Sequence, residues 1–147
     1  MTNDSTPPNP DWLVELDHTA DAGIAVLAAD LPELFARAAW GMFSLITDLA
    51  AVRPLHTTRL VITASDRQAL LARWLSELNF RHVTQRALFC RFAVLELSEE
   101  RLVADVSGEP CDLARHTVFT EIKAVTFHSL QIKPGPHGWR AEVIFDL

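Results

Sequence analysis

The fold is decided by residues 30–46, DLPELFARAAWGMFSLI, which carry the pattern of an amphipathic helix. Asp30 is a favoured N-cap residue, Glu33 follows three places later, and Pro32 is tolerated in a first helical turn. Apolar residues then recur at steps of three and four, which predicts one buried stripe. Its members are Leu31, Leu34, Phe35, Ala38, Met42, Phe43 and Ile46.

Working outward, the sequence predicts one more helix and several strands. Ser65 and Gln68 form a capping box, and the stripe behind them is Leu70, Leu71, Trp74, Leu75 and Leu78. β-branched or alternating runs predict strands at 12–16, 22–28, 60–63, 89–97, 101–106, 118–130 and 139–145. A turn is expected at Gly108 and Pro110, and a hairpin loop at 134–138.

This order of elements does not alternate as a doubly wound parallel sheet would. It predicts the α+β class, a single domain over residues 11–147 in which a largely antiparallel β-sheet packs with two α-helices. Residues 1–10 are polar and rich in proline, so we expect a flexible tail there.

Composition limits the kind of function. The 147 residues are 49% hydrophobic and 22% charged, which is typical of a globular protein, and no apolar run approaches the roughly 18 residues of a membrane span. The start lacks a secretory pattern, so we expect a cytoplasmic protein that does not contact the membrane. A net charge of −6 disfavours direct nucleic-acid binding and suits a basic protein partner or a cation. Cys90 and Cys111 are expected as buried small hydrophobic residues, and a disulfide between them is not required.

Two acidic groups stand near the two ends of the sequence. Asp17, His18 and Asp21 lie within five residues, where they could bind a hard cation such as Ca²⁺ or Mg²⁺, do acid–base work, or form an ordinary Asx turn. Asp146 and the carboxylate of Leu147 repel each other unless a cation lies between them; alternatively, both face water.

A third polar group lies in the segment 120–128. If this segment is a strand, Glu121 and Lys123 point to one face, either as a functional pair or as a solvated one. His128 is either a ligand or a histidine at the core edge. No Gly-rich phosphate loop, GxSxG elbow or zinc-deaminase pattern occurs. The residues alone therefore indicate a binding module with a hard-cation site.

Several pieces, in order from about residue 12 to the end, resemble the archease family. They are DHTADAG at 17–23, AWGMF at 39–43, LSEL at 75–78, GEP at 108–110 with Asp112 and Arg115-His116, EIKAVTFH at 121–128, and IFDL at 144–147. The resemblance implies a divalent cation, usually Ca²⁺, with Mg²⁺ or Mn²⁺ as alternatives. It implies Asp21, Asp146 and Leu147 as ligands, with Asp17, His18, Glu121, Lys123 and His128 as supporting residues.

The same resemblance implies a function without catalysis by the chain itself. Archeases are accessory activators of the GTP-dependent RNA-splicing ligase in tRNA splicing and RNA repair, and they promote its guanylylation and multiple turnover. RNA would then be reached only through the ligase. Two alternatives are a metal-dependent hydrolase of a small phosphorylated substrate, with Asp17 or His128 as base, and a general chaperone-like adaptor.

Overall fold

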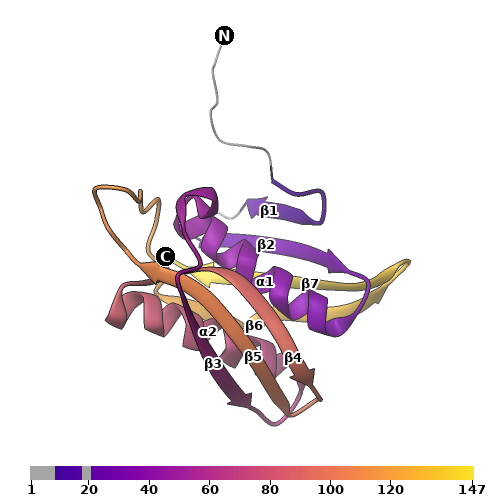
Figure 1. Cartoon of the computed structure of the whole chain (residues 1–147). Coiled ribbons are helices and arrows are strands. Elements are labelled where there is room, and N and C mark those ends of the chain that lie inside the picture. The colour runs from indigo at the N-terminus through magenta and orange to yellow at the C-terminus, as the bar shows by residue number, and fades with distance from the viewer. Residues whose placement is uncertain (1–8, 18–20) are drawn as a thin grey trace.

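The computed structural model describes residues 9–17 and 21–147, and at Asp17 and His128 it describes the backbone only. These residues form helices and strands in the α+β arrangement predicted from the sequence (Figure 1). The helices are α1 (Leu31–Ile46), α2 (Arg67–Gln85) and a short 3-10 helix, η1 (Leu49–Ala51). In this part of the chain no helix is long and apolar enough to cross a membrane.

The strands are divided between two sheets, and every strand pair is antiparallel. The first sheet has the order β1 (Leu13–Asp17), β2 (Asp21–Ala28), β7 (Gly138–Asp146) and β6 (Ala124–Gly135). The second has the order β3 (His56–Thr63), β5 (Arg101–Pro110) and β4 (Ala87–Leu97).

Helix α1 forms where the sequence predicts it. The Asp30 carboxylate accepts a hydrogen bond from the Glu33 amide at 2.9 Å, which caps the helix start. The predicted stripe is buried from Leu34 to Ile46. Gly41 allows this helix to lie close to the sheet, because a β-carbon there would stand 2.9 Å from the Ile24 side chain.

Helix α2 begins one residue later than the capping box suggests. Asp66, and not Ser65, is the N-cap, and its carboxylate accepts from the Ala69 amide at 2.8 Å. A carboxylate also interacts favourably with the positive end of the helix dipole, which explains why it takes the cap position. The helix ends at Gln85, and its C-cap residue, Arg86, has a left-handed backbone with φ of 59°.

Two expectations about the second half of the chain are wrong. Gly108 and Pro110 do not form a turn: they continue β5, and Gly108 is needed because a β-carbon there would lie 1.8 Å from the Leu88 carbonyl oxygen of β4. The strand expected over 118–130 begins only at Ala124. Before it, the chain is held by a bridge from Val118 to Thr47 and by single hydrogen bonds.

The two α-helices, α1 and α2, each contact both sheets, and this joins the sheets into one core. Helix α1 packs on β2 and β7 of the first sheet and on β4 of the second, while α2 packs on β6 and on all three strands of the second. The buried Trp74 indole on α2 donates to the Phe35 carbonyl on α1 at 2.9 Å. Polar groups at the strand ends are therefore attached to one shared core.

Candidate cation site

Asp21 and Asp146 lie directly opposite each other at one end of the first sheet. Asp21 begins β2, Asp146 ends β7, and the two are partners in the antiparallel register. On the other side of β7, Asp146 pairs with Ala124, the first residue of β6. Directly opposed residues share a face of the sheet, with β-carbons about 4.5–5.5 Å apart. Two carboxylates more than a hundred positions apart in sequence are thus neighbours.

Neither carboxylate has a counter-charge from the described residues. No ion pair or side-chain hydrogen bond to either group occurs in residues 9–17 and 21–147. Asp146 is exposed and Asp21 is half-buried. Like charges directly opposite one another destabilise a sheet, so this pair is stable only if solvent or a cation reduces the repulsion.

The donor set suits a hard cation in chemistry but covers only part of its coordination shell. Carboxylate oxygens are the ligands that Ca²⁺ and Mg²⁺ prefer. In the described part of the chain, no group of three or more His, Cys, Asp or Glu side chains gathers as a metal site. Asp21 and Asp146 would therefore hold a cation together with backbone or terminal oxygens, such as those of Leu147, and with water.

The other predicted residues are distributed as follows. Asp17 ends β1 and pairs with Ala22, one register row away from Asp21. The side chains of Asp17 and His128 and the whole of His18 lie outside what the structure describes.

The predicted strand geometry of Glu121 and Lys123 is wrong, because both precede β6. Both are nonetheless exposed on either side of the buried Ile122. The Lys123 amide donates to the Asp146 carbonyl at 2.7 Å, so its backbone reaches the site.

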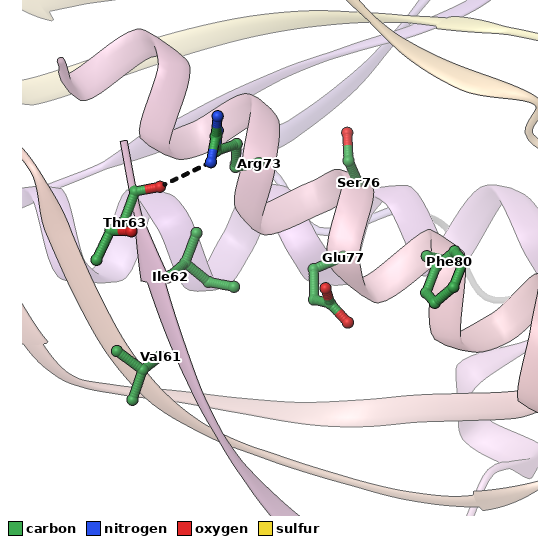
Figure 2. Close-up of a pocket in the computed structure, with 7 residues that line it drawn as sticks. All are labelled: Val61, Ile62, Thr63, Arg73, Ser76, Glu77 and Phe80. Atoms are coloured by element: carbon green, nitrogen blue, oxygen red, sulfur yellow. Dashed lines mark hydrogen bonds between the residues drawn. The ribbon is translucent and has the colours of Figure 1, made fainter. Parts of the chain in front are cut away.

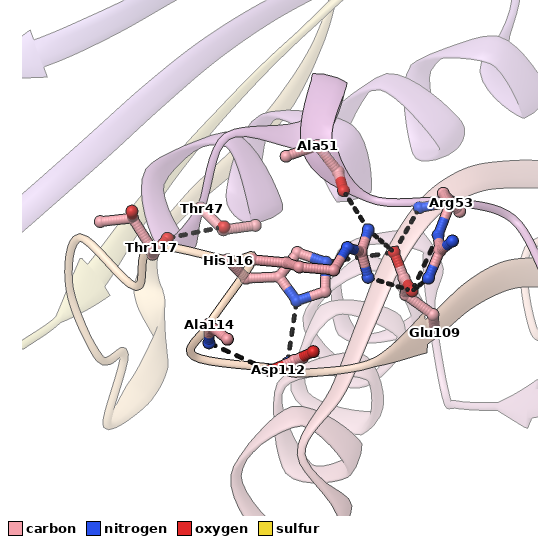
Figure 3. Close-up of polar contacts among 9 residues, drawn as sticks. Thr47, Ala51, Arg53, Glu109, Asp112, Ala114, His116 and Thr117 are labelled. Carbon is pink, nitrogen blue, oxygen red and sulfur yellow. Dashed lines mark hydrogen bonds and ion pairs between the residues drawn. The ribbon is translucent and has the colours of Figure 1, made fainter.

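A second polar cluster, for which the sequence predicts no role, surrounds Glu109 at the end of β5 (Figure 3). The Glu109 side chain is only 3% exposed. Arg115 binds its two oxygens at 2.9 and 3.2 Å, and Arg53 donates from its backbone amide at 2.7 Å and from its guanidinium at 3.1 Å. The hydrogen bonds from Arg115, followed by those from Arg53 and His116, hold the pKa of Glu109 far below its usual range.

The hydrogen bonds of His116 fix its protonation. The Asp112 amide donates to its Nδ1 at 2.9 Å, so Nδ1 carries no proton. Its Nε2 lies 3.1 Å from the Glu109 carboxylate and must be the donor. The imidazole is therefore neutral and serves as one more donor to Glu109. Arg115 and His116 follow Glu109 by six and seven residues, and that spacing was the available signal for this cluster.

A cavity of about 530 Å³ lies elsewhere, between β3 and α2 (Figure 2). Val61, Ile62 and Phe80 give it an apolar lining. Its two charged side chains already have partners: Glu77 pairs with Arg81 at 2.9 Å, and Arg73 donates to the Thr63 carbonyl at 3.4 Å. Both charged groups among the described lining residues are thus already hydrogen-bonded within the chain.

Cys90 does not supply a reactive group either. Cys90 and Cys111 are free, and each is only partly buried rather than buried as predicted. Burial raises the pKa of the Cys90 thiol, which keeps it protonated and a poor nucleophile.

Comparison with known proteins decides the family. A sequence model of the Archease protein family matches residues 14–147. The chain belongs to the archease family. Protein archease of Methanopyrus kandleri is 40% identical over 136 residues, which cover 90% of this chain and 97% of that protein. Protein archease of Methanothermobacter thermautotrophicus is 39% identical over 135 residues, covering 89% of this chain and 95% of that protein.

A solved structure supports the same assignment. The solution structure of Methanobacterium thermoautotrophicum protein 1598 has a TM-score of 0.77 and 35% identity, and the match covers 92% of this chain and 99% of that chain. The archease assignment thus covers both helices and both sheets. It includes Asp21 and Asp146, which stand inside the matched residues 14–147.

Proposed function

We propose that this archease-family chain is a divalent-cation-binding accessory protein that activates the GTP-dependent RNA-splicing ligase in the cytoplasm. In this role it is not itself an enzyme. It promotes guanylylation of the ligase and its multiple turnover in tRNA splicing and RNA repair, and it reaches RNA only through the ligase. Ca²⁺ is the proposed cation, with Mg²⁺ and Mn²⁺ as alternatives.

The observation that carries this proposal is the pairing of Asp21 with Asp146 in the strand register. The two residues that family resemblance names as ligands come from opposite ends of the sequence, yet they are neighbours in the sheet. Their mutual repulsion supplies a physical reason for a cation to bind. The carboxylate or carbonyl of Leu147, one residue beyond Asp146, is proposed to add a further oxygen.

The role of each part of the chain follows from its charge and position. Asp21 and Asp146 bind the cation at one end of the first sheet, where a partner can approach. When bound, the cation would supply positive charge beside the phosphates of the incoming nucleotide at the ligase interface. The net charge of −6 favours association with a basic, RNA-binding partner.

The test is a ligase guanylylation assay with this protein at substoichiometric ligase, with and without a chelator. We expect Asp21→Ala and Asp146→Ala to remain folded and to abolish the stimulation, and we expect the chelator to abolish it for the wild type. Asp105→Ala is the matched control, because it removes an acidic strand residue of the second sheet that is paired with Arg59 at 2.9 Å. Normal stimulation by both site variants would disprove the assignment.

The same preparations separate the alternatives. Turnover of phosphate esters by the purified protein with Ca²⁺ or Mn²⁺ alone would indicate the hydrolase. Activity towards unrelated client proteins that is indifferent to Asp21→Ala and Asp146→Ala would indicate the chaperone-like adaptor.

A further inference from the structure

Asn79 is a buried polar residue on the packed face of α2, where most of the other buried side chains are apolar. It is 6% exposed, and its neighbours on α2, Leu75 and Leu78, are fully buried. Its side-chain amide donates to the Ile122 carbonyl at 2.7 Å. Its Oδ1 is buried and has no hydrogen-bond partner among the described residues. Rotating the amide would place two oxygens 2.7 Å apart, so the donor must face Ile122.

This arrangement costs stability, which a residue present only for packing would avoid. A buried acceptor without a partner loses its hydration and gains no hydrogen bond in return, which lowers stability. Leucine has the same branching and the same number of side-chain heavy atoms, and it would stand among Leu75 and Leu78 without that penalty. The retained bond to Ile122 therefore points to a task other than filling the core.

The bond from Asn79 leads directly to the candidate cation site. Ile122 is itself buried, at 1% exposure, and the next residue, Lys123, donates its amide to the Asp146 carbonyl at 2.7 Å. Residues 120–123 are outside any strand, so they lack the backbone hydrogen bonds to β7 that hold β6 from Ala124 onward. Earlier in the loop, Phe119 is tied to the Ile46 carbonyl at 2.7 Å. Between Phe119 and Lys123, Asn79 is the described side chain that holds this segment.

We propose that Asn79 is a positioning residue: it fixes Ile122, so that the Lys123 amide can hold the end of β7 where Asp146 is displayed. The expected effect of Asn79 on cation affinity rests on the proposed function. Its expected effect on the hydrogen bond from the Lys123 amide does not. Residues that orient metal ligands without touching the metal commonly change metal affinity by about 10- to 100-fold when they are replaced.

The test is Asn79→Leu, measured by amide hydrogen exchange and by calorimetric titration with CaCl₂. Loss of the donor leaves the Ile122 carbonyl buried without a partner, so the segment shifts to find water. We expect the Lys123 amide to exchange at least about 10-fold faster, with the Phe119 amide unchanged, and Ca²⁺ affinity to fall about 10-fold. The melting temperature should change little, because the variant also removes the unpartnered Oδ1.

His82→Leu is the matched control. His82 is also a buried polar residue of α2, at 5% exposure, but its Nδ1 bonds to the Ala87 carbonyl of β4 at 3.0 Å. We expect this variant to leave Lys123 exchange and Ca²⁺ affinity unchanged. A similar loss in both variants would show general loosening of α2 and overturn the proposal.

The outcomes also separate this proposal from the proposed function. Unchanged exchange at Lys123 in Asn79→Leu overturns the positioning role, and so does an equal acceleration at Phe119. Unchanged Ca²⁺ affinity in this variant overturns the link to the cation. If the wild type does not bind Ca²⁺, the proposed cation site fails, and exchange at Lys123 alone decides the role of Asn79.

Discussion

The Glu109 cluster and the Asp21–Asp146 pair show two ways in which one fold places carboxylates at strand ends. Glu109 is buried, and Arg53 and Arg115 supply its counter-charges from within the chain. Asp21 and Asp146 oppose each other in the register and receive no counter-charge from the described residues. A carboxylate whose partners are built in stabilises the fold, whereas a carboxylate pair without them is available to a ligand.

The largest expected effect tests whether the Glu109 cluster stabilises the fold. Glu109→Gln removes a buried negative charge and leaves Arg53 and Arg115 unpaired, so we expect the melting temperature to fall by about 10 °C. The control is Asp105→Asn, which breaks an ion pair with the exposed Arg59 and should cost about 1–2 °C. Equal, small effects in thermal unfolding would show that the cluster is not a structural element.

A smaller effect on the melting temperature is expected when the Glu109 carboxylate is titrated with acid. The pKa of Glu109 lies below its ordinary value of 4.5 because Arg115 and Arg53 bind the charged form. The unfolded chain therefore takes up the proton first on acidification. The contribution of the Glu109 carboxylate to the free energy of unfolding is complete above about pH 4.5, and it is lost as the pH falls through the lower pKa of the folded state. The difference in melting temperature between wild type and Glu109→Gln should narrow from pH 6 to pH 3.

The elements with strong periodicity were predictable from the sequence. The stripe of α1 and its Asp30 cap follow from local chemistry, and the structure contains both. The cap of α2 was misplaced because Ser65 and Asp66 are both good N-cap residues, and spacing alone does not choose between them. The sequence predicts a turn at Gly108 because glycine weakens strands in general. Its actual cause is the close approach of β4, which only the tertiary structure reveals.

The candidate site was predictable only in part, for a similar reason. Spacing marked Asp21 and Asp146 as separate acidic points, and family resemblance joined them as proposed ligands. These two residues are neighbours because of the register of β2 with β7, which pairs residues from the two ends of the sequence. The Glu109 cluster depends on the loop after β5 folding back over η1 and the residues that follow it, and so no local pattern assigns partners to Arg53.

The next effect tests the ligand-binding half of the comparison. If Asp21 and Asp146 bind Ca²⁺, a free concentration 100 times the dissociation constant should raise the melting temperature of the wild type by about 5–10 °C. Asp146→Asn should abolish this rise, and Glu109→Gln should retain it despite its lower starting temperature. A rise that persists in Asp146→Asn would place the cation elsewhere.

The smallest expected effect distinguishes the two carboxylate sites most clearly, because here the melting temperature should rise, whereas it falls in Glu109→Gln. In chelator, Asp21→Asn removes one of two opposed charges while keeping the size of the side chain. We therefore expect the melting temperature to increase by about 1–3 °C, since like charges directly opposite in a sheet are destabilising. Raising the ionic strength should reduce this gain, because the pair is partly exposed and salt screens it. If Asp21→Asn instead destabilises the protein as Glu109→Gln does, then Asp21 already has a partner, and the two regions do not differ in kind.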